Sequence, residues 1–301
     1  MATTPVPPPD PVPAALPDLP DGVPEGFPDG APAGGRFAGY GVLVTGGARG
    51  IGAAIAARLT AEGARVLLAD LDEACARETA AALPGAVGLH CDVRDRASVE
   101  AAVAYAVAGF GRLDLLVNNA FSCTRDRRRF EDEPDETWER DLDTTLGGAF
   151  RCSRAALPHL ADSGRGVIVN IGSVNGLQDF GSHAYSAAKA GLASLTRTLA
   201  GHGAPRGVRV NQVDPGTIRT RNWAEREREL AVLADRVYPL GRVGEPEDVA
   251  AAVAFLASRD AAWITGTSLR VDGGLLAVHS GFAAAVGSWR TEAGDEGGDR
   301  S

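Results

Sequence analysis

The segment between Tyr40 and Asp70 constrains the fold more than any other part of the chain. An apolar run, GVLVTGG, ends in glycines and passes into a stretch whose Ile51, Ile55 and Leu59 recur at helical spacing. A second apolar run, RVLLAD, follows directly. Two such runs joined through a helix predict parallel strands, because a parallel pair needs a crossover connection of this size. We therefore expect a strand, helix, strand unit at the start of a parallel sheet.

Further short apolar runs repeat this pattern along the chain. They are AVGLHCDV, LDLLVNNA, GVIVNIGS, VRVNQVDP and TSLRVDGG, and they alternate with Ala-rich segments of helical periodicity such as SVEAAVAYAVAGFG and EDVAAAVAFLAS. This alternation predicts a single Rossmann-type α/β fold, a doubly wound parallel sheet with helices on both faces. Two helix starts are also indicated, since Ser98 stands at an N-cap position and Pro246 in a first turn.

The two ends of the chain differ from its middle in composition. Eleven of the 18 prolines fall in the first 36 residues, together with five acidic residues against one arginine. Such a stretch cannot pack a core, so we expect a disordered, Pro-rich leader over 1–36. The last residues are again acidic, which predicts a flexible tail over 282–301. A single domain over 37–281 accounts for the rest.

The net charge of the chain and the length of its apolar runs exclude several classes of protein. The net charge is −9, and the acidic ends carry most of it. A body so close to neutral argues against a nucleic-acid surface, which needs a basic face. We find no apolar run long enough to span a membrane and no basic, apolar start typical of a signal peptide. The expected location is therefore the cytoplasm, with no membrane partner.

The cysteines and histidines do not show metal-binding spacing. Cys75, Cys91, Cys123 and Cys152 form no CxxC pair, and the five histidines are scattered. We expect reduced, structural thiols and no metal site.

A glycine-rich loop lies between the first predicted strand and its helix. Gly46, Gly50 and Gly52 occur in TGGARGIG, where glycine permits a tight turn and lets backbone N–H groups approach a pyrophosphate. Asp70 ends the second strand 18 residues after Gly52, at the place where a dinucleotide fold uses a carboxylate to bind ribose hydroxyls. A plain structural turn is the alternative for the loop alone. The two features together predict a dinucleotide site.

Asp70 also bears on which nicotinamide cofactor is used. A carboxylate beside the ribose 2′ position repels a phosphate and hydrogen-bonds a free hydroxyl, which favours NAD over NADP. Arg49 stands in the glycine loop and opposes this inference, because a guanidinium can bind a 2′-phosphate. Arg49 can equally pair with Asp70 or another carboxylate. NAD is the favoured cofactor, with NADP as the alternative.

A candidate catalytic set of three residues begins at the end of the fifth predicted strand. Tyr185 and Lys189 are four apart in a helical segment, so they share a face, and Ser173 ends the strand twelve residues before Tyr185. A phenol can act as a base near neutral pH only if a nearby cation stabilises its phenolate. The alternative is an ordinary surface pair. Of the 30 basic residues 29 are arginine, and the single lysine stands where a compact, titratable ammonium is needed.

These residues resemble the short-chain dehydrogenase/reductase family in its compact form. The matching motifs are TGGARGIG, the Asp70 strand end, CDV at 91–93, NNA at 118–120, Ser173, Tyr185-SAA-Lys189 and PGTIRT at 215–220. The resemblance covers about 37–280. It implies an NAD(P)-dependent oxidoreductase that interconverts a secondary alcohol and a ketone, usually as a homotetramer. Further cofactor contacts implied by the resemblance are Ile51 at the pyrophosphate, Asp92 and Val93 at the adenine, Asn119 at the ribose, Lys189 at the nicotinamide ribose, and Pro215, Gly216, Ile218 and Thr220 at the nicotinamide end.

Two positions depart from the family pattern. Phe121 stands where a glycine usually follows NNA, which narrows the expected pocket. Thr145 stands at the family's catalytic asparagine, whose backbone carbonyl holds a water of the lysine's proton relay. Since threonine retains the carbonyl, we expect slowed rather than abolished turnover.

Two functions from different classes therefore compete. The favoured one is a dehydrogenase or reductase acting on a small-molecule secondary alcohol or ketone, with Tyr185 as acid or base, in a tetramer or dimer. The alternative is a cofactor-binding sensor or scaffold with weak or no turnover, which Thr145 and Phe121 favour. Sugar epimerase or dehydratase chemistry also uses a Tyr-xxx-Lys pair, but about 60 residues after PGTIRT leave little room for its larger substrate domain.

Overall fold

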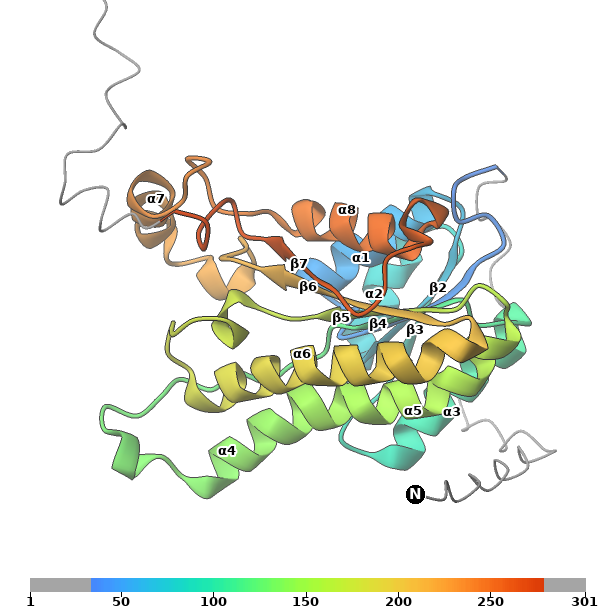
Figure 1. Ribbon diagram of the computed structural model, residues 1–301, viewed down its shortest axis with the longest axis horizontal. Helices are drawn as coiled ribbons and strands as arrows, with labels where there is room; N and C mark the ends of the chain where they lie inside the picture. Colours follow the sequence, from blue (N-terminus) through green and yellow to red (C-terminus); the bar gives the residue numbers. More distant parts are fainter. Residues whose placement is uncertain (1–33, 279–301) are drawn as a thin grey trace, which may run out of the picture.

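The computed structural model describes residues 34–278 (Figure 1). Most of the predicted leader and all of the predicted tail lie outside these residues, so the domain boundaries stay predictions. The first described residues already pack against the rest of the domain. Arg36 pairs with Glu62 through Nε and Oε2 at 2.6 Å, and the next residue, Phe37, is fully buried.

The described residues form one seven-stranded sheet in which every neighbouring pair of strands is parallel. The strand order is β3-β2-β1-β4-β5-β6-β7, which is the doubly wound arrangement expected from the sequence. The predicted fold class is thus confirmed. The strands are β1 (Gly41–Thr45), β2 (Arg65–Asp70), β3 (Ala86–His90), β4 (Leu115–Asn118), β5 (Val167–Ile171), β6 (Arg209–Pro215) and β7 (Ser268–Val271).

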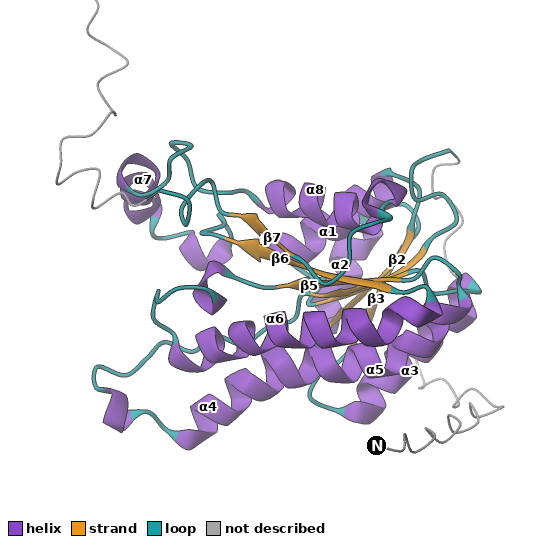
Figure 2. Cartoon of the chain, viewed as in Figure 1, coloured by secondary structure: helices purple, strands orange, loops and turns teal. Residues whose placement is uncertain are grey.

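Helices cover both faces of the sheet (Figures 1 and 2). One face carries α1 (Gly50–Ala61), α2 (Glu73–Ala81) and α8 (Pro246–Ala257), and the other carries α3 (Arg96–Phe110), α5 (Gly148–Asp162) and α6 (His183–Gly203). Two further helices, α4 (Asp135–Leu142) and α7 (Glu227–Arg236), extend toward the left of the view in Figure 1. A π-helical turn over Asp143–Gly147 joins α4 to α5.

The core consists of two apolar layers, one on each face of the sheet. Successive side chains of β1 alternate between them: Val42 and Val44 pack with α1 and α8, whereas Leu43 packs with α3 and α5. All five residues of β1 are buried. A strand covered on both faces favours apolar residues on both of them, which explains why β1 and β2 read as apolar runs in the sequence.

The two predicted helix starts have different outcomes. Pro246 is the first residue of α8, as predicted, and a reciprocal capping box between Glu245 and Asp248 closes that end. The Ser98 prediction was wrong: α3 begins three residues earlier, because the Asp95 carboxylate accepts hydrogen bonds from the backbone amides of Ala97 and Ser98. The Ser98 hydroxyl instead accepts a hydrogen bond from the Asp92 amide at 3.1 Å.

The strand order places a binding crevice at a defined edge. The chain runs from β1 outward to β3 and then returns to the other side of β1 with β4. Because the crossovers diverge at this reversal, a crevice opens beyond the carboxyl ends of β1 and β4. The glycine loop, the NNA segment and the candidate catalytic residues all follow strands at this edge.

Candidate active site

A cavity of about 1040 Å³ opens at this edge. It brings together nearly all of the residues that the sequence predicts for a site. Those that line it are Gly46, Arg49, Gly50, Ile51, Asp70, Asp92, Val93, Asn119, Ser173, Tyr185, Lys189, Pro215, Gly216, Ile218 and Thr220. Gly52 and Thr145 do not line it. Both contact the backbone of residues that do line it: Gly52 packs against Gly46, and Thr145 bonds to Ser122.

The glycine loop has the shape that a phosphate cradle requires. Gly46 has φ +61° and Gly50 has φ +53°, a region that residues with a Cβ adopt only at a cost. A Cβ on Gly52 would lie 2.2 Å from the Gly46 carbonyl oxygen, so only glycine permits this approach of helix and loop. Arg49 precedes α1 without a side-chain cap on the helix. The amides of the first turn of α1 are therefore available to an anion.

The Asp70 carboxylate is held in place at the end of β2. Its Oδ2 accepts a hydrogen bond from the Ala48 amide and its Oδ1 accepts one from the Asp72 amide, both at 3.0 Å. Arg49 pairs with Asp72 and not with Asp70, which answers a question that the sequence left open. This pairing lowers the pKa of Asp72 below its ordinary value.

Asn119 supports the loop from the neighbouring strand. Its Nδ2 donates to the carbonyl oxygens of Thr45 at 3.1 Å and Gly46 at 2.8 Å. Its side chain thus joins the segment after β4 to the segment after β1 across the crevice, while still lining the cavity. The residues present fit a dinucleotide: an open helix end, a cradle that a Cβ would fill and a fixed carboxylate lie in one cavity.

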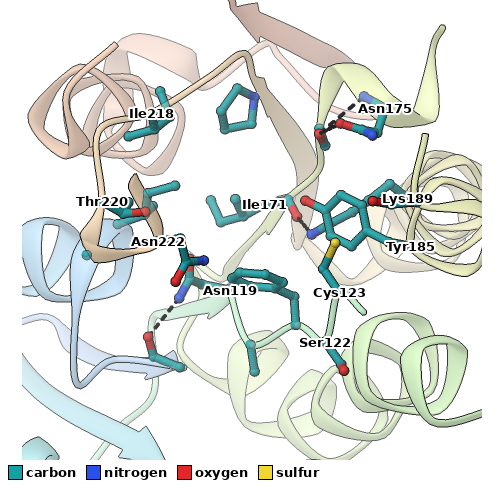
Figure 3. A pocket seen from close by; sticks show the side chains of 18 of the residues that line it. Asn119, Ser122, Cys123, Ile171, Asn175, Tyr185, Lys189, Ile218, Thr220 and Asn222 are labelled. Atoms are coloured by element: carbon teal, nitrogen blue, oxygen red, sulfur yellow. Dashed lines mark hydrogen bonds between the residues drawn. The ribbon is translucent and has the colours of Figure 1, made fainter. Parts of the chain in front are cut away.

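Tyr185 and Lys189 lie together at the other end of the cavity (Figure 3), and Ser173 also lines the cavity. Ser173 follows β5, and its Oγ donates to Asn175 Oδ1 at 3.1 Å. Lys189 lies one turn after Tyr185 on α6, is 2 % exposed, and donates from Nζ to the Ile171 carbonyl oxygen at 2.5 Å. The end of β5 therefore fixes both the serine and the ammonium.

Burial sets the charge of the tyrosine and the lysine. It lowers the pKa of Lys189 to about 8, so the group is mostly an ammonium at neutral pH. It also raises the pKa of Tyr185 well above its ordinary value, and the Ser173 hydroxyl opposes this only in part. The Lys189 Nζ lies 5.3 Å from the centre of the Tyr185 ring. Tyr185 is thus a proton donor at neutral pH in the protein alone, and its role as a base requires further positive charge.

Thr145 lies in the π-helical turn between α4 and α5. It is 1 % exposed, and its Oγ1 accepts a hydrogen bond from the Ser122 amide at 3.1 Å and donates one to the Ser122 carbonyl at 3.2 Å. A π turn leaves backbone groups out of the regular helical ladder, and such turns are frequent at functional sites. The threonine hydroxyl therefore holds the segment after β4, which forms one wall of the cavity.

Phe121 presents an aromatic ring to the cavity next to the catalytic set. The ring is 49 % exposed and meets Tyr185 edge-on, with 5.8 Å between ring centres. The Lys189 Nζ also lies 5.8 Å from the centre of the Phe121 ring. A glycine here would leave this space open, so Phe121 reduces the room beside the Tyr185 hydroxyl.

Sequence reasoning missed several residues that shape the site. Asp126 accepts hydrogen bonds from the amides of Ser182 at 2.6 Å and His183 at 3.0 Å, and so anchors the start of α6. Cys123 lines the cavity, and Asp214 lies buried behind Ser173. An acidic residue near the end of the predicted strand VRVNQVDP was the signal available for Asp214. The contact of Asp126 spans 56 residues and leaves no local pattern.

Other features of the described residues bear on metal and membrane chemistry. The four cysteines are free, and no group of three His, Cys, Asp or Glu side chains within 34–278 is placed to hold a metal ion. Among the helices of this part of the chain, none combines the length and apolar character needed to cross a membrane.

Comparison with known proteins assigns the chain and its fold to a family. The family model described as enoyl-(acyl carrier protein) reductase matches residues 46–276. The crystal structure of gox2181 superposes with a TM-score of 0.77 at 37% sequence identity, covering 81% of this chain and 98% of that one.

Relatives of known description match over nearly their whole lengths. The 3-oxoacyl-(acyl-carrier-protein) reductase FabG of Escherichia coli is 42% identical, covering 80% of this chain and 99% of its own. The 3beta-hydroxysteroid dehydrogenase 1 of Eggerthella lenta is 41% identical, with 82% and 97% covered. The meso-2,3-butanediol dehydrogenase of Serratia marcescens is 40% identical, with 80% and 96% covered. Together with the fold and the motifs in its cavity, these matches show that the chain belongs to the short-chain dehydrogenase/reductase family of oxidoreductases.

Proposed function

We propose that the protein interconverts a secondary alcohol and a ketone by hydride transfer to or from a nicotinamide cofactor, with Tyr185 as the acid or base. The observation that carries this proposal is the convergence of Ser173, Tyr185 and Lys189 in the cavity that also contains the glycine loop. A dinucleotide site alone fits many proteins. A titratable pair beside it fits proton transfer coupled to hydride transfer.

The side chains have distinct roles in this proposal. The Ser173 hydroxyl, now bonded to Asn175, turns to hold the substrate oxygen, and the Tyr185 hydroxyl gives or takes the proton at that oxygen. Lys189 stays fixed by the Ile171 carbonyl and supplies positive charge beside the phenol. When bound, the nicotinamide ring supplies the hydride or accepts it, and its oxidised form adds positive charge.

The cavity wall favours an apolar substrate of small to medium size. Phe121, Phe180 and Trp223 line the cavity, with Leu233 and Val237 of the α7 region. Relatives of similar identity are named for a hydroxysteroid and for a butanediol, so the family places substrates of different size in this position. We infer a secondary alcohol or ketone whose carbon skeleton packs against Phe121.

NAD is the proposed cofactor, and the charges at the ribose end support it. The Asp70 carboxylate lines the cavity there, and Asp72 pairs with Arg49 and so offsets its charge. We expect Asp72→Asn to free Arg49 and to raise kcat/KM with NADPH by about tenfold relative to NADH, a change of about 1.4 kcal/mol. The matched control is Glu73→Gln, which removes the next carboxylate, one that pairs with Arg77. A wild-type preference for NADPH would contradict the NAD assignment.

The function is tested on a panel of secondary alcohols and ketones. Turnover of each compound is measured as the change in nicotinamide absorbance, with NAD(H) and with NADP(H). Turnover that is lost in Tyr185→Phe, while cofactor affinity is retained, supports the proposal. Cofactor binding without turnover across the panel favours the alternative, a sensor or scaffold.

The assembly and the location of the protein also stay proposals. By resemblance to the family we propose a homo-oligomer, a tetramer or a dimer, which light scattering on the full chain tests. The cytoplasmic location expected from the sequence stays a prediction.

A further inference from the structure

A chain of buried polar side chains crosses the sheet beneath the active site. Asn118 on β4 donates from Nδ2 to Ser153 Oγ at 3.0 Å and to Asn170 Oδ1 on β5 at 2.8 Å. Asn170 donates to Thr196 Oγ1 at 2.9 Å, and that hydroxyl lies 3.2 Å from Gln212 Oε1 on β6. Every member is at most 4 % exposed. Polar groups placed this deep need partners, and here most of them bond to one another, whereas Asn118 Oδ1 has no partner among the described residues.

The chain ends at a carboxylate, Asp214. Gln212 Nε2 donates to Asp214 Oδ1 at 2.6 Å, whereas Asp214 Oδ2 has no hydrogen-bond partner among the described residues. The residue is 0 % exposed. Asp114, a carboxylate buried to the same extent, is paired with two guanidinium groups. A buried carboxylate without a contacting cation is costly, so its charge calls for an explanation.

Asp214 and Lys189 lie against the same short stretch of β5. A Cβ on Gly172 would be 1.9 Å from Asp214 Oδ1, so the carboxylate rests directly on the backbone between Ile171 and Ser173. Lys189 donates to the carbonyl of Ile171. Within 34–278, Lys189 forms no ion pair at 4.0 Å or less. The nearby carboxylate therefore acts through space and not through a salt bridge.

The other titratable groups around Lys189 do not replace this charge. Cys123, from the segment after β4, faces the pair, and burial raises the pKa of its thiol, so it is neutral. Arg270 on β7 stands opposite Asp214 in the strand register, but it is exposed. On α8, Glu247 is in the first turn, and Asp248 pairs with Arg242.

The effect of the carboxylate on its neighbours has a definite sign. Burial lowers the pKa of Lys189, and the negative charge of Asp214 raises it again. Burial raises the pKa of Asp214 itself, and the hydrogen bond from Gln212 opposes that rise. Charges interact strongly in a protein interior even beyond contact distance, because little water screens them. The hydrogen bond from Gln212 thus favours the ionised form of the carboxylate against burial, and an ionised Asp214 favours the protonated form of Lys189.

We propose that Asp214, held by Gln212, is a positioning residue that acts as the buried counter-charge of Lys189 and keeps it in the ammonium form beside Tyr185. This inference rests on the proposed function for its catalytic meaning. The charge relation itself is independent of any substrate.

The single lysine makes a direct test possible. Lysine labelled with carbon-13 at Cε gives one side-chain resonance, that of Lys189. Its chemical shift is followed by NMR as a function of pH, without substrate or turnover. In Asp214→Asn we expect the midpoint to fall from about 8 by about one pH unit. The control Asp114→Asn removes an equally buried carboxylate at the opposite edge of the sheet and is expected to leave the midpoint unchanged.

The outcomes separate this proposal from a purely structural role and from the proposed function. An unchanged midpoint in folded Asp214→Asn, or an equal fall in Asp114→Asn, overturns the proposal. If Asp214→Asn does not fold, Asp214→Ala removes the same charge with less volume beside Gly172, and its midpoint decides in the same way. In alcohol oxidation the alkaline limb of the pH profile, where Lys189 loses the proton that the reaction needs, is expected to move to lower pH by the same amount. A shifted NMR midpoint in a protein without turnover would support the counter-charge and contradict only the proposed reaction.

Discussion

At the scale of single residues, the use of lysine is the most informative feature of the chain. Position 189 holds the one lysine among 30 basic residues, and the structure buries it against the Ile171 carbonyl. Arginine satisfies surface ion pairs throughout the molecule, as at Arg96 with Glu100. A guanidinium is wider than an ammonium and does not deprotonate near neutral pH. The site next to Tyr185 needs a cation that is compact and whose pKa is about 8.

We therefore expect Lys189→Arg to lower kcat by about a hundredfold or more, because both proton transfer and the fit beside Tyr185 are lost. Steady-state kinetics on the best substrate of the panel measure it, with circular dichroism to confirm folding. Arg96→Lys makes the reverse exchange in an exposed pair and is expected to leave kcat unchanged. Full activity in Lys189→Arg would remove the reason for assigning this lysine to the reaction.

At the scale of elements, the π-helical turn between α4 and α5 carries Thr145 to the back of the cavity wall. Its hydroxyl makes both hydrogen bonds to the backbone of Ser122. Thr145→Val keeps the shape and leaves the two buried backbone groups unpaired, so we expect a loss of about 2 kcal/mol in the free energy of unfolding and a lower kcat. Thr145→Asn can restore both bonds, and we expect its kcat to exceed that of the wild type. Denaturant titration and kinetics measure the two effects.

Thr144→Val is the control for this element, since the Thr144 hydroxyl donates to the Arg140 carbonyl on the preceding helix, α4, and not to the segment after β4. We expect it to change stability by less than about 0.5 kcal/mol. Equal losses in the two valine variants would show that the hydrogen bonds of the Thr145 hydroxyl give it no special place in the turn.

The elements also show what a sequence can predict and what it cannot. The seven strands were predictable because strands buried on both faces read as apolar runs, and glycines mark where β1 meets α1. Asp95 was missed as the cap of α3 because serine and aspartate both suit that role and spacing alone does not rank them. The π turn was missed because polar α4 shows no apolar period before it.

Within the site, the residues attached to motifs were predictable and those joined by tertiary contacts were not. Ser173, Tyr185 and Lys189 stand at fixed offsets from one another on β5 and α6, so spacing alone placed them together. Arg49 had two carboxylates within reach, and only the structure shows that it pairs with Asp72. Asp214 meets the site through Gly172 on a neighbouring strand, a contact set by sheet register.

At the scale of the whole molecule, the edge of the sheet opposite the active site depends on one carboxylate. Asp114 is 0 % exposed and accepts a hydrogen bond from the Gly41 amide at 2.9 Å, at the start of β1. It also pairs with Arg112 at 2.7 Å and with Arg165 at 2.8 Å, which precede β4 and β5. The three central strands that present the cavity at one end are therefore tied together at the other.

Asp114→Asn tests this dependence through its pH profile. Burial alone would raise the pKa of Asp114, but hydrogen bonds from Arg112, Arg165 and the Gly41 amide hold it below its ordinary value. An ionised Asp114 therefore stabilises the fold at pH above the ordinary carboxyl value of about 4, and this stabilisation is lost as pH falls through the lower, folded value. We expect the variant to unfold about 2 kcal/mol more easily at pH 7, with the difference from wild type shrinking only below about pH 4. Glu73→Gln, in the exposed pair with Arg77, is expected to differ from wild type by less than about 0.5 kcal/mol at any pH. A difference for Asp114→Asn that stays constant to pH 2 would show that shape rather than charge ties the strands together at this edge.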